Sequence, residues 1–353
     1  MQIQQKQARK QTEKQIAGIE REILAVYTEA MHQINLELQA LYAKILSGVK
    51  PDDYYNTIIK YDRLTKNLKT IDALYIKQSI KAGGMTGDAS ALALSNSYYK
   101  NQFVLSWFAP NIGIDLDFTL LPPEIVEMSV YGNLSSWQEI GKKAQEKMLE
   151  TFGPIKAYIP QSGTLTSFLV ENRQKEVLKI NRAITSGLLQ GNTYTQTSKA
   201  VSEVIGKVTK EGVTGAKASA MRIVRTESNR TYNAGAYANS QAVASQGVKI
   251  EREWLATLDI LTRGKHQALD GQRVGVDKPF VSDGAEAMFP GGFGIASQDI
   301  RCRCSTIDVV DGIPPSARTG RNADGEYEVF DWQNYETWAK DNGMKQDSLG
   351  KLV

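Results

Sequence analysis

The chain has 353 residues, of which 41% are hydrophobic and 23% are charged, and its formal net charge at pH 7 is +3. This composition is ordinary for a soluble globular protein that buries a core, and the length allows two or three domains. No run of about 18 apolar residues is present, which excludes a transmembrane helix. Residues 1–15 are polar and lack the apolar centre of a secretory signal, so we expect no such signal here.

Residues 4–46 are predicted to form one long amphipathic helix, because apolar side chains recur there in steps of three and four. A second helix is predicted to end at Gly83 and Gly84, and a third to cover residues 89–108. The simplest arrangement is an antiparallel hairpin or bundle. A helix of roughly 40 residues spans about 60 Å. Part of its apolar stripe is therefore expected to contact another protein, while the rest is core.

Four later helices are predicted, at residues 135–150, 165–189, 195–205 and 217–244. Residues 171–230 hold eleven Lys or Arg against five Asp or Glu. These charges belong either to a solvated helix face or to a surface that contacts phosphates. The candidates for DNA contact are Arg173, Lys175, Lys179, Arg182, Arg222 and Arg225. Few aromatic residues and no zinc-finger or RNA-binding spacing occur here, so any such contact would be independent of sequence.

The stretch from Lys249 to Val310 is predicted to form a small α+β unit. Residues 249–258 and 300–310 are expected to be strands, and residues 261–269 about two helical turns closed by Asp270 and Gly271. Between the helix and the second strand, residues 274–294 are dense in Gly, Pro and Asp. These residue types exclude a long helix and indicate loops and short strands.

Both cysteines of the chain, Cys302 and Cys304, lie in this stretch with His266. A disulfide between such close neighbours would close a strained ring, so they are expected to be thiols in a reducing compartment. Alternate residues of a strand share a face, and with His266 the pair can supply zinc ligands, with Asp259 or Asp299 as a fourth. The alternative is that both cysteines are small apolar core residues. Because a CxxC or a second histidine is missing, we predict no metal and no cofactor.

The order of residues in this stretch resembles the phage Mu protein F-like head morphogenesis family, the minor capsid proteins of tailed phages. The matching residues are Trp254, Asp259, Arg263, His266, Leu269, Asp270, Gly271, Pro279, Phe280, Pro290, Gly291, Cys302, Arg303 and Cys304. Upstream, residues 222–238 carry an R-T-E core that is similar to the helix of this family. The resemblance is clearest over about residues 163–310.

The resemblance and the helical periodicity together predict an α+β fold with three parts. Residues 1–160 are expected to be a helical, partner-docking region, residues 161–310 the head morphogenesis domain with short strands, and residues 311–353 a tail with one short helix. The residues predicted to form the structural motif are Arg225, Glu227, Trp254, Asp259, Arg263, His266, Asp270, Gly271, Cys302 and Cys304.

Within this motif, Asp259, Arg263 and Glu227 are expected to form a buried charge network, since arginine binds carboxylates through two parallel hydrogen bonds. The alternative is an enzyme or toxin module that uses Glu227, Asp259, Arg263 and His266, for example as an ADP-ribosyltransferase-like site. Such a site needs a carboxylate positioned in a substrate cleft, which the sequence does not demonstrate. We therefore predict a protein without enzymatic activity.

The family resemblance implies a minor head protein that acts in procapsid assembly. Its implied partners are the phage portal protein, a major capsid or scaffolding protein, and packaged or ejected double-stranded DNA bound without sequence specificity. No membrane partner is implied. The implied location is the interior of the virion, with the host cytoplasm as the compartment during assembly.

Overall fold

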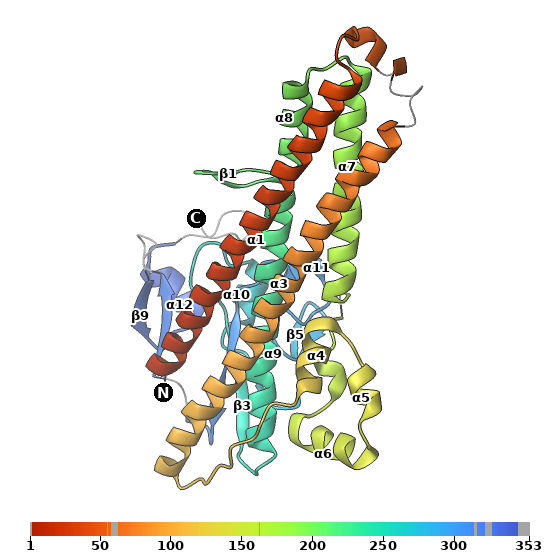
Figure 1. Cartoon of the computed structure of the whole chain (residues 1–353). Helices are drawn as coiled ribbons and strands as arrows, with labels where there is room; N and C mark the ends of the chain where they lie inside the picture. The colour runs from red at the N-terminus through yellow and green to blue at the C-terminus, as the bar shows by residue number, and fades with distance from the viewer. Residues whose placement is uncertain are drawn as a thin grey trace. The chain divides into compact units, whose positions relative to one another are not determined.

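The computed structural model describes residues 2–54, 56–57, 63–161, 163–313, 316–321 and 327–344 (Figure 1). Contacts within the chain divide it into two compact units, and each unit is assembled from segments that are separated in the sequence. Unit 1 contains Met1–Ile16, Ala89–Leu165 and Arg225–Val353, and unit 2 contains Ala17–Asp88 and Thr166–Val224. The predicted division of the chain at residues 161 and 311 stays a prediction.

The described residues form helices from Gln2 onward and short strands from Val208 onward. The helices are α1 (Gln2–Ile45), η1 (Pro51–Asp53), α3 (Arg63–Phe108), η2 (Ala109–Ile112), α4 (Pro123–Tyr131), α5 (Ser135–Glu139), α6 (Lys142–Phe152), η3 (Ile155–Ala157), α7 (Leu165–Leu189), α8 (Tyr194–Ile205), α9 (Gly215–Ala244), α10 (Gly264–Leu269), α11 (Ala296–Asp299) and α12 (Tyr335–Asp341). The strands are β1 (Val208–Thr209), β2 (Gly212–Val213), β3 (Ile250–Leu255), β4 (Arg273–Gly275), β5 (Phe280–Ser282), β6 (Ala285–Ala287), β7 (Ser305–Val310), β8 (Ala317–Arg321) and β9 (Tyr327–Asp331).

Unit 2 is a helical bundle held by polar contacts between its helices as well as by apolar packing. The hydroxyl of Tyr42 on α1 donates to the carbonyl of Asn192 (3.1 Å) and lies 2.8 Å from the Thr197 hydroxyl of α8. Other interhelical hydrogen bonds join Gln78 to Gln33 (3.4 Å), Asn181 to Asp72 (3.2 Å), Ser198 to Asn35 (2.7 Å) and Lys217 to Thr28 (2.9 Å). The predicted bundle is present in unit 2, but α7, α8 and the start of α9 contribute to it too.

The apolar stripe of α1 faces the interior of unit 2. Ile23, Ala30, Ile34 and Leu38, which are spaced by seven, four and four residues, are each fully buried. This spacing places the side chains on one face of a helix. For these residues the intramolecular interpretation is correct, and contact of α1 with another protein stays a prediction.

The prediction that a helix ends at Gly83 and Gly84 is wrong, because α3 continues through both residues to Phe108. A Cβ atom on Gly83 would lie 3.1 Å from a methyl carbon of Leu169 on α7. Gly83 therefore allows α7 to approach α3 closely, and packing outweighs the low helix propensity of glycine. The opposite error occurs at residues 135–150. The sequence predicted one continuous helix there, but the structure divides it into α5 and α6 at Gly141.

Unit 1 is built on a three-stranded antiparallel sheet in the order β4-β3-β7, with β3 in the centre. In the register of β3 with β7, Ile250 lies opposite Val310 and Leu255 opposite Ser305. Two short hairpins, β5-β6 and β8-β9, complete the strands of unit 1 among the described residues. Long helices and a small antiparallel sheet confirm the predicted α+β fold.

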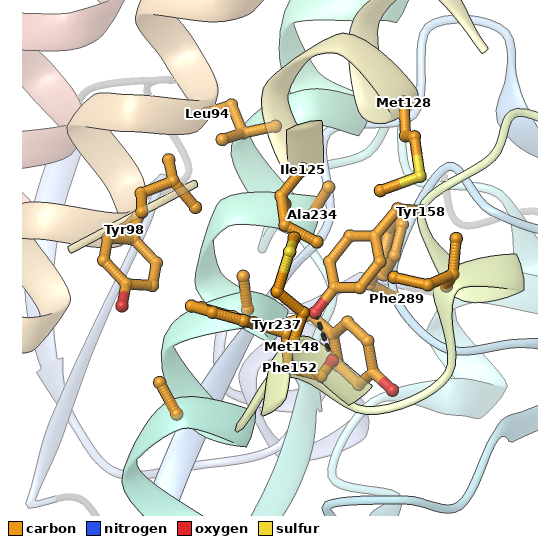
Figure 2. Packing of buried hydrophobic residues seen from close by; sticks show 14 residues of the cluster. Leu94, Tyr98, Ile125, Met128, Met148, Phe152, Tyr158, Ala234, Tyr237 and Phe289 are labelled. Atoms are coloured by element: carbon orange, nitrogen blue, oxygen red, sulfur yellow. Dashed lines mark hydrogen bonds between the residues drawn. The ribbon is translucent and has the colours of Figure 1, made fainter. Parts of the chain in front are cut away.

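A cluster of buried apolar residues joins α4, α6 and η3 to the parts of α3 and α9 that belong to unit 1 (Figure 2). Leu94 and Tyr98 of α3 and Tyr237 of α9 are fully buried in it. The hydroxyl of Tyr158 donates to the carbonyl of Phe152 at 2.6 Å, so the phenol is satisfied inside the cluster. This packing gives the segment from Leu121 to Tyr158 a structural role in unit 1.

No helix among the described residues combines the length and the apolar character needed to cross a bilayer.

Gly235 provides a test of the close packing between α9 and α3. A Cβ atom there would lie 2.2 Å from the carbonyl oxygen of Leu94, whereas a Cβ atom on Gly84 would meet no atom within 4 Å. Gly235→Ala is expected to lower the free energy of unfolding by about 2–3 kcal/mol, because backbone atoms must move. Gly84→Ala is expected to raise it by roughly 0.5–1 kcal/mol. Thermal and urea unfolding measure both changes, and equal effects of the two substitutions would contradict the packing.

Candidate functional site

The candidate site is centred on Trp254, in the middle strand of the unit 1 sheet. Its side chain is fully buried. The indole ring packs edge-on against His266 (5.9 Å between ring centroids) and Phe280 (5.2 Å), and it is tilted against Phe293 (5.8 Å). Such aromatic contacts fix the orientation of each ring. Trp254 therefore positions the His266 ring between α10 and the loop before β7.

The turn that leads into α10 is held by Asp259. One carboxylate oxygen of Asp259 accepts a hydrogen bond from the backbone N–H of Leu261 (2.9 Å), and the Thr262 hydroxyl donates to the carbonyl of Thr257 (2.6 Å). These local bonds close the loop between β3 and α10. As a result, α10 begins at Gly264 and places His266 on its buried side.

Cys302, Arg303 and Cys304 form an extended segment in which alternate side chains point in opposite directions. The two thiols point to His266: its Nδ1 lies 3.7 Å from the sulfur of Cys302 and 3.3 Å from that of Cys304. Arg303 points the other way and forms a two-fold ion pair with Asp259, in which the longer contact is 2.8 Å. The structure therefore brings the three predicted residues into one buried cluster.

The two thiols have different acidities. Burial raises the pKa of the Cys304 thiol, but its contacts with Cys302 and His266 outweigh this effect and lower the pKa to about 5. The hydrogen bond of Cys302 to Cys304, together with burial, raises the pKa of Cys302 well above its ordinary value. The contact with His266 therefore favours the thiolate form of Cys304 over that of Cys302.

The predicted charge network of Asp259, Arg263 and Glu227 is wrong in its pairing. Asp259 pairs with Arg303, as described above, and Glu227 pairs with Arg230 on its own helix through contacts of 3.0 and 2.9 Å. Arg263 donates to the carbonyls of Gln298 (3.1 Å) and Ile300. The physical reason is sequence proximity and alternation: Arg230 is one helical turn from Glu227, and the CRC alternation aims Arg303 at Asp259.

Asp270 accepts hydrogen bonds from three parts of unit 1. The buried guanidinium of Arg318 in β8 binds it at 2.7 and 2.8 Å, and the backbone N–H groups of Ala256 and Tyr335 donate to it at 2.7 and 2.6 Å. Gly271 follows with a positive φ of 80° and donates its N–H to the carbonyl of Trp254 (2.9 Å). Asp270 and Gly271 thus end α10, as predicted, and also fasten β8 and α12.

The predicted DNA-contacting residues fall in both units. On α7 of unit 2, Lys175, Lys179 and Arg182 are exposed, while Arg173 is half-buried. Arg222, on the part of α9 in unit 2, is exposed and lies near the buried carboxylate of Glu176. Arg225 is exposed on the part of α9 that belongs to unit 1. The structure therefore assembles a basic row on α7 but does not join all six residues.

Sequence reasoning missed Arg252, which is fully buried two residues before Trp254. Its guanidinium donates to the carbonyls of Lys278 (2.5 Å) and Met288, and it lies over the rings of Tyr237 (4.8 Å) and Phe280 (5.2 Å). The period of two along a strand places Arg252 on the same face as Trp254. That signal indicates a buried arginine, while its carbonyl partners follow only from the structure.

A cleft of about 510 Å³ lies beside this site in unit 1. It is lined by Glu253, Gly271, Arg273, Trp332, Gln333, Asn334 and Thr337. None of the four residues proposed for an enzymatic site lines it. Glu227, Asp259 and His266 are each at most 5% exposed, and the two carboxylates are engaged by arginines. This geometry favours structural roles for them.

Comparison with known proteins adds three findings. The family model described as "Phage Mu protein F like protein" matches residues 178–307. Minor head protein GP7 of Bacillus phage SPP1 is 26% identical over 328 residues, which cover 92% of this chain and 93% of that protein. NAD(+)--arginine ADP-ribosyltransferase EFV of Enterococcus faecalis (strain ATCC 700802 / V583) is 33% identical over 187 residues, which cover 53% of this chain but span only 36% of that protein. No solved structure gives a significant match.

The buried pair of Asp270 and Arg318 is expected to be far more important for stability than an exposed pair in the same unit. Arg318→Met removes one partner and leaves a buried carboxylate uncompensated, so it is expected to lower the free energy of unfolding by about 3–5 kcal/mol. The matched control is Lys265→Met, which breaks the exposed pair of Lys265 with Asp283 (2.6 Å) and is expected to cost at most about 1 kcal/mol. Urea denaturation followed by tryptophan fluorescence measures both, and similar losses would refute this assignment.

Proposed function

Because the chain belongs to the phage Mu protein F-like family, we propose that it is a minor head protein that is incorporated into the procapsid of a tailed phage. The observation that carries this proposal is the match to minor head protein GP7 over 92% of this chain and 93% of that protein. A match over nearly the whole length of both chains supports a shared role for both units, beyond the matched family segment.

The similarity to the ADP-ribosyltransferase supports a shared domain rather than a shared reaction. The aligned segment spans 36% of that protein, so most of that protein lies outside the aligned part. In this chain the candidate acid–base residues are buried, and each already contacts another side chain. Glu227 is paired with Arg230, Asp259 with Arg303, and His266 faces two thiols. A general acid or base must reach its substrate, and we therefore assign this chain no enzymatic activity.

An exposed apolar patch on unit 1 is the surface that we assign to the contact with the portal protein. Phe103 on α3 is 67% exposed, and Leu120, in the segment before α4, is 72% exposed. Tyr99, four residues before Phe103, stacks on Phe118, two residues before Leu120, with ring centroids 6.0 Å apart, which joins the helix to that segment. Neighbouring large apolar groups at a surface are typical of sites for protein–protein contact.

The portal assignment predicts co-purification. Full-length chain produced with portal, scaffolding and major capsid proteins is expected to sediment with procapsids and to bind isolated portal. Phe103→Ser combined with Leu120→Ser is expected to abolish portal binding without a loss of the helical signal in circular dichroism. The matched control is Leu178→Ser with Leu189→Ser, which changes two exposed leucines of unit 2.

Absence of the unmodified chain from procapsids would contradict the role as a head protein. Normal incorporation of the Phe103 and Leu120 variant would contradict only the surface assignment.

The basic row on α7 is the part of the chain that we assign to DNA contact. Lys175, Lys179 and Arg182 are spaced by four and three residues, so their exposed side chains share one face of the helix. Lys175 also pairs with Glu171 at 2.5 Å, but both side chains are more than 60% exposed. An exposed ion pair contributes little free energy, so Lys175 can leave Glu171 to contact a phosphate. Lysine and arginine rows of this kind contact phosphates without reading bases.

DNA binding is expected to weaken steeply with salt and to be the same for unrelated sequences. Changing Lys175, Lys179 and Arg182 to Glu is expected to lower affinity and to reduce the slope of log K against log salt by about 0.9 for each lost phosphate contact. The control changes Lys142, Lys143 and Lys147 of α6 to Glu, an equal change in net charge at exposed positions of unit 1. Fluorescence anisotropy with double-stranded DNA measures both, and an equal effect of the two triple variants would sink the assignment to α7.

A further inference from the structure

We propose that His266, Cys302 and Cys304 bind a zinc ion that links α10 to the segment before β7. The three residues are the group of potential metal ligands found among the described residues, and their ligand atoms lie within 4.8 Å of one another. Two of the ligands are thiols and one is an imidazole. Sulfur and nitrogen ligands of this kind bind zinc in preference to calcium or magnesium. This assignment departs from the sequence-based prediction of no metal.

The distances from the imidazole nitrogen to the two sulfurs fit a tetrahedral ion. With Zn–S near 2.3 Å and Zn–N near 2.0–2.1 Å, a tetrahedral angle places sulfur and nitrogen about 3.6 Å apart. The observed separations from His266 Nδ1 are 3.7 Å to Cys302 and 3.3 Å to Cys304. A single Nδ1 atom has one lone pair or one proton and cannot form good hydrogen bonds with two sulfurs at once. A metal ion between them satisfies all three atoms together.

The fourth position of the ion is not supplied by the carboxylates that the sequence suggested. Asp259 is held by Arg303. Asp299 accepts the backbone N–H groups of Phe293 and Ile295 at 3.2 Å each. Both carboxylates therefore support the loops around the cluster, and His266, Cys302 and Cys304 are the protein ligands of the proposed ion.

The ion would stabilise a defined part of unit 1. Cys302 and Cys304 belong to the same buried cluster as Trp254, Leu269 and Phe280, and His266 packs on the Trp254 ring. Binding at this position joins α10, which follows β3, to the segment that enters β7. Because the unfolded chain holds no such site, affinity for the metal is also free energy of folding.

The test uses the reduced full-length chain. The metal content of protein purified without added chelator is measured by elemental analysis, and metal-free protein is titrated with cobalt(II) and then with zinc. We expect one equivalent of metal per chain, thiolate-to-cobalt charge-transfer absorption that zinc displaces, and slow alkylation of both thiols until a strong chelator is added. The chelator is also expected to lower the melting temperature.

Three single variants, Cys302→Ser, Cys304→Ser and His266→Asn, are each expected to lose the stoichiometric metal and the cobalt absorption. The matched control is His32→Asn, which changes the other histidine of the chain, an exposed residue of α1. Folding of each variant is checked by circular dichroism, and the alkylation measurement on unmodified protein does not depend on any variant. Folded, reduced protein that binds neither zinc nor cobalt, or whose thiols react equally fast with and without zinc, overturns the proposal.

Discussion

The ion pair and hydrogen bonds of the buried Asp270 carboxylate are the interactions on which the architecture of unit 1 depends most directly. It holds the guanidinium of Arg318 and the backbone N–H groups of Ala256 and Tyr335, so the end of β3, the hairpin β8-β9 and α12 meet at one side chain. An ion pair in a dry environment is stable only when its remaining hydrogen bonds are made. Here the Arg318 guanidinium also donates to the carbonyls of Ala256 and Gln333.

Local signals in the sequence were sufficient for much of this fold. The three-and-four spacing of α1, the capping box of Thr193 and Gln196 at the start of α8, and the Asp270-Gly271 turn each depend on neighbouring residues. The predicted helix end at Gly83 was wrong because it depends on a residue that is distant in the sequence. Whether a helix continues through a glycine depends on what approaches it, and here Leu169, distant in sequence, occupies the space.

The candidate site shows the same division. Strand alternation predicted that Cys302 and Cys304 face one way, and the structure adds His266 as the group that they face. Charge alone did not identify the partner of Asp259, because Arg263 and Arg303 are equally plausible by residue type. The choice of Arg303 follows from the direction of its side chain, while Arg263 reaches backbone carbonyls instead. Side-chain direction is known only from the three-dimensional structure, so this pairing could not be predicted from the sequence.

The interleaving of the two units has a consequence for synthesis of the chain. Unit 2 contains no residue beyond Val224, so all of its segments are synthesised before β3 and β7. Unit 1 includes the first sixteen residues, where Arg9 donates to the carbonyl of Arg303 and to the side chain of Asn229. Domains fold as units during translation when their segments are available. The helical bundle can therefore form first, and Arg9 meets its acceptor carbonyl only after Arg303 has been translated.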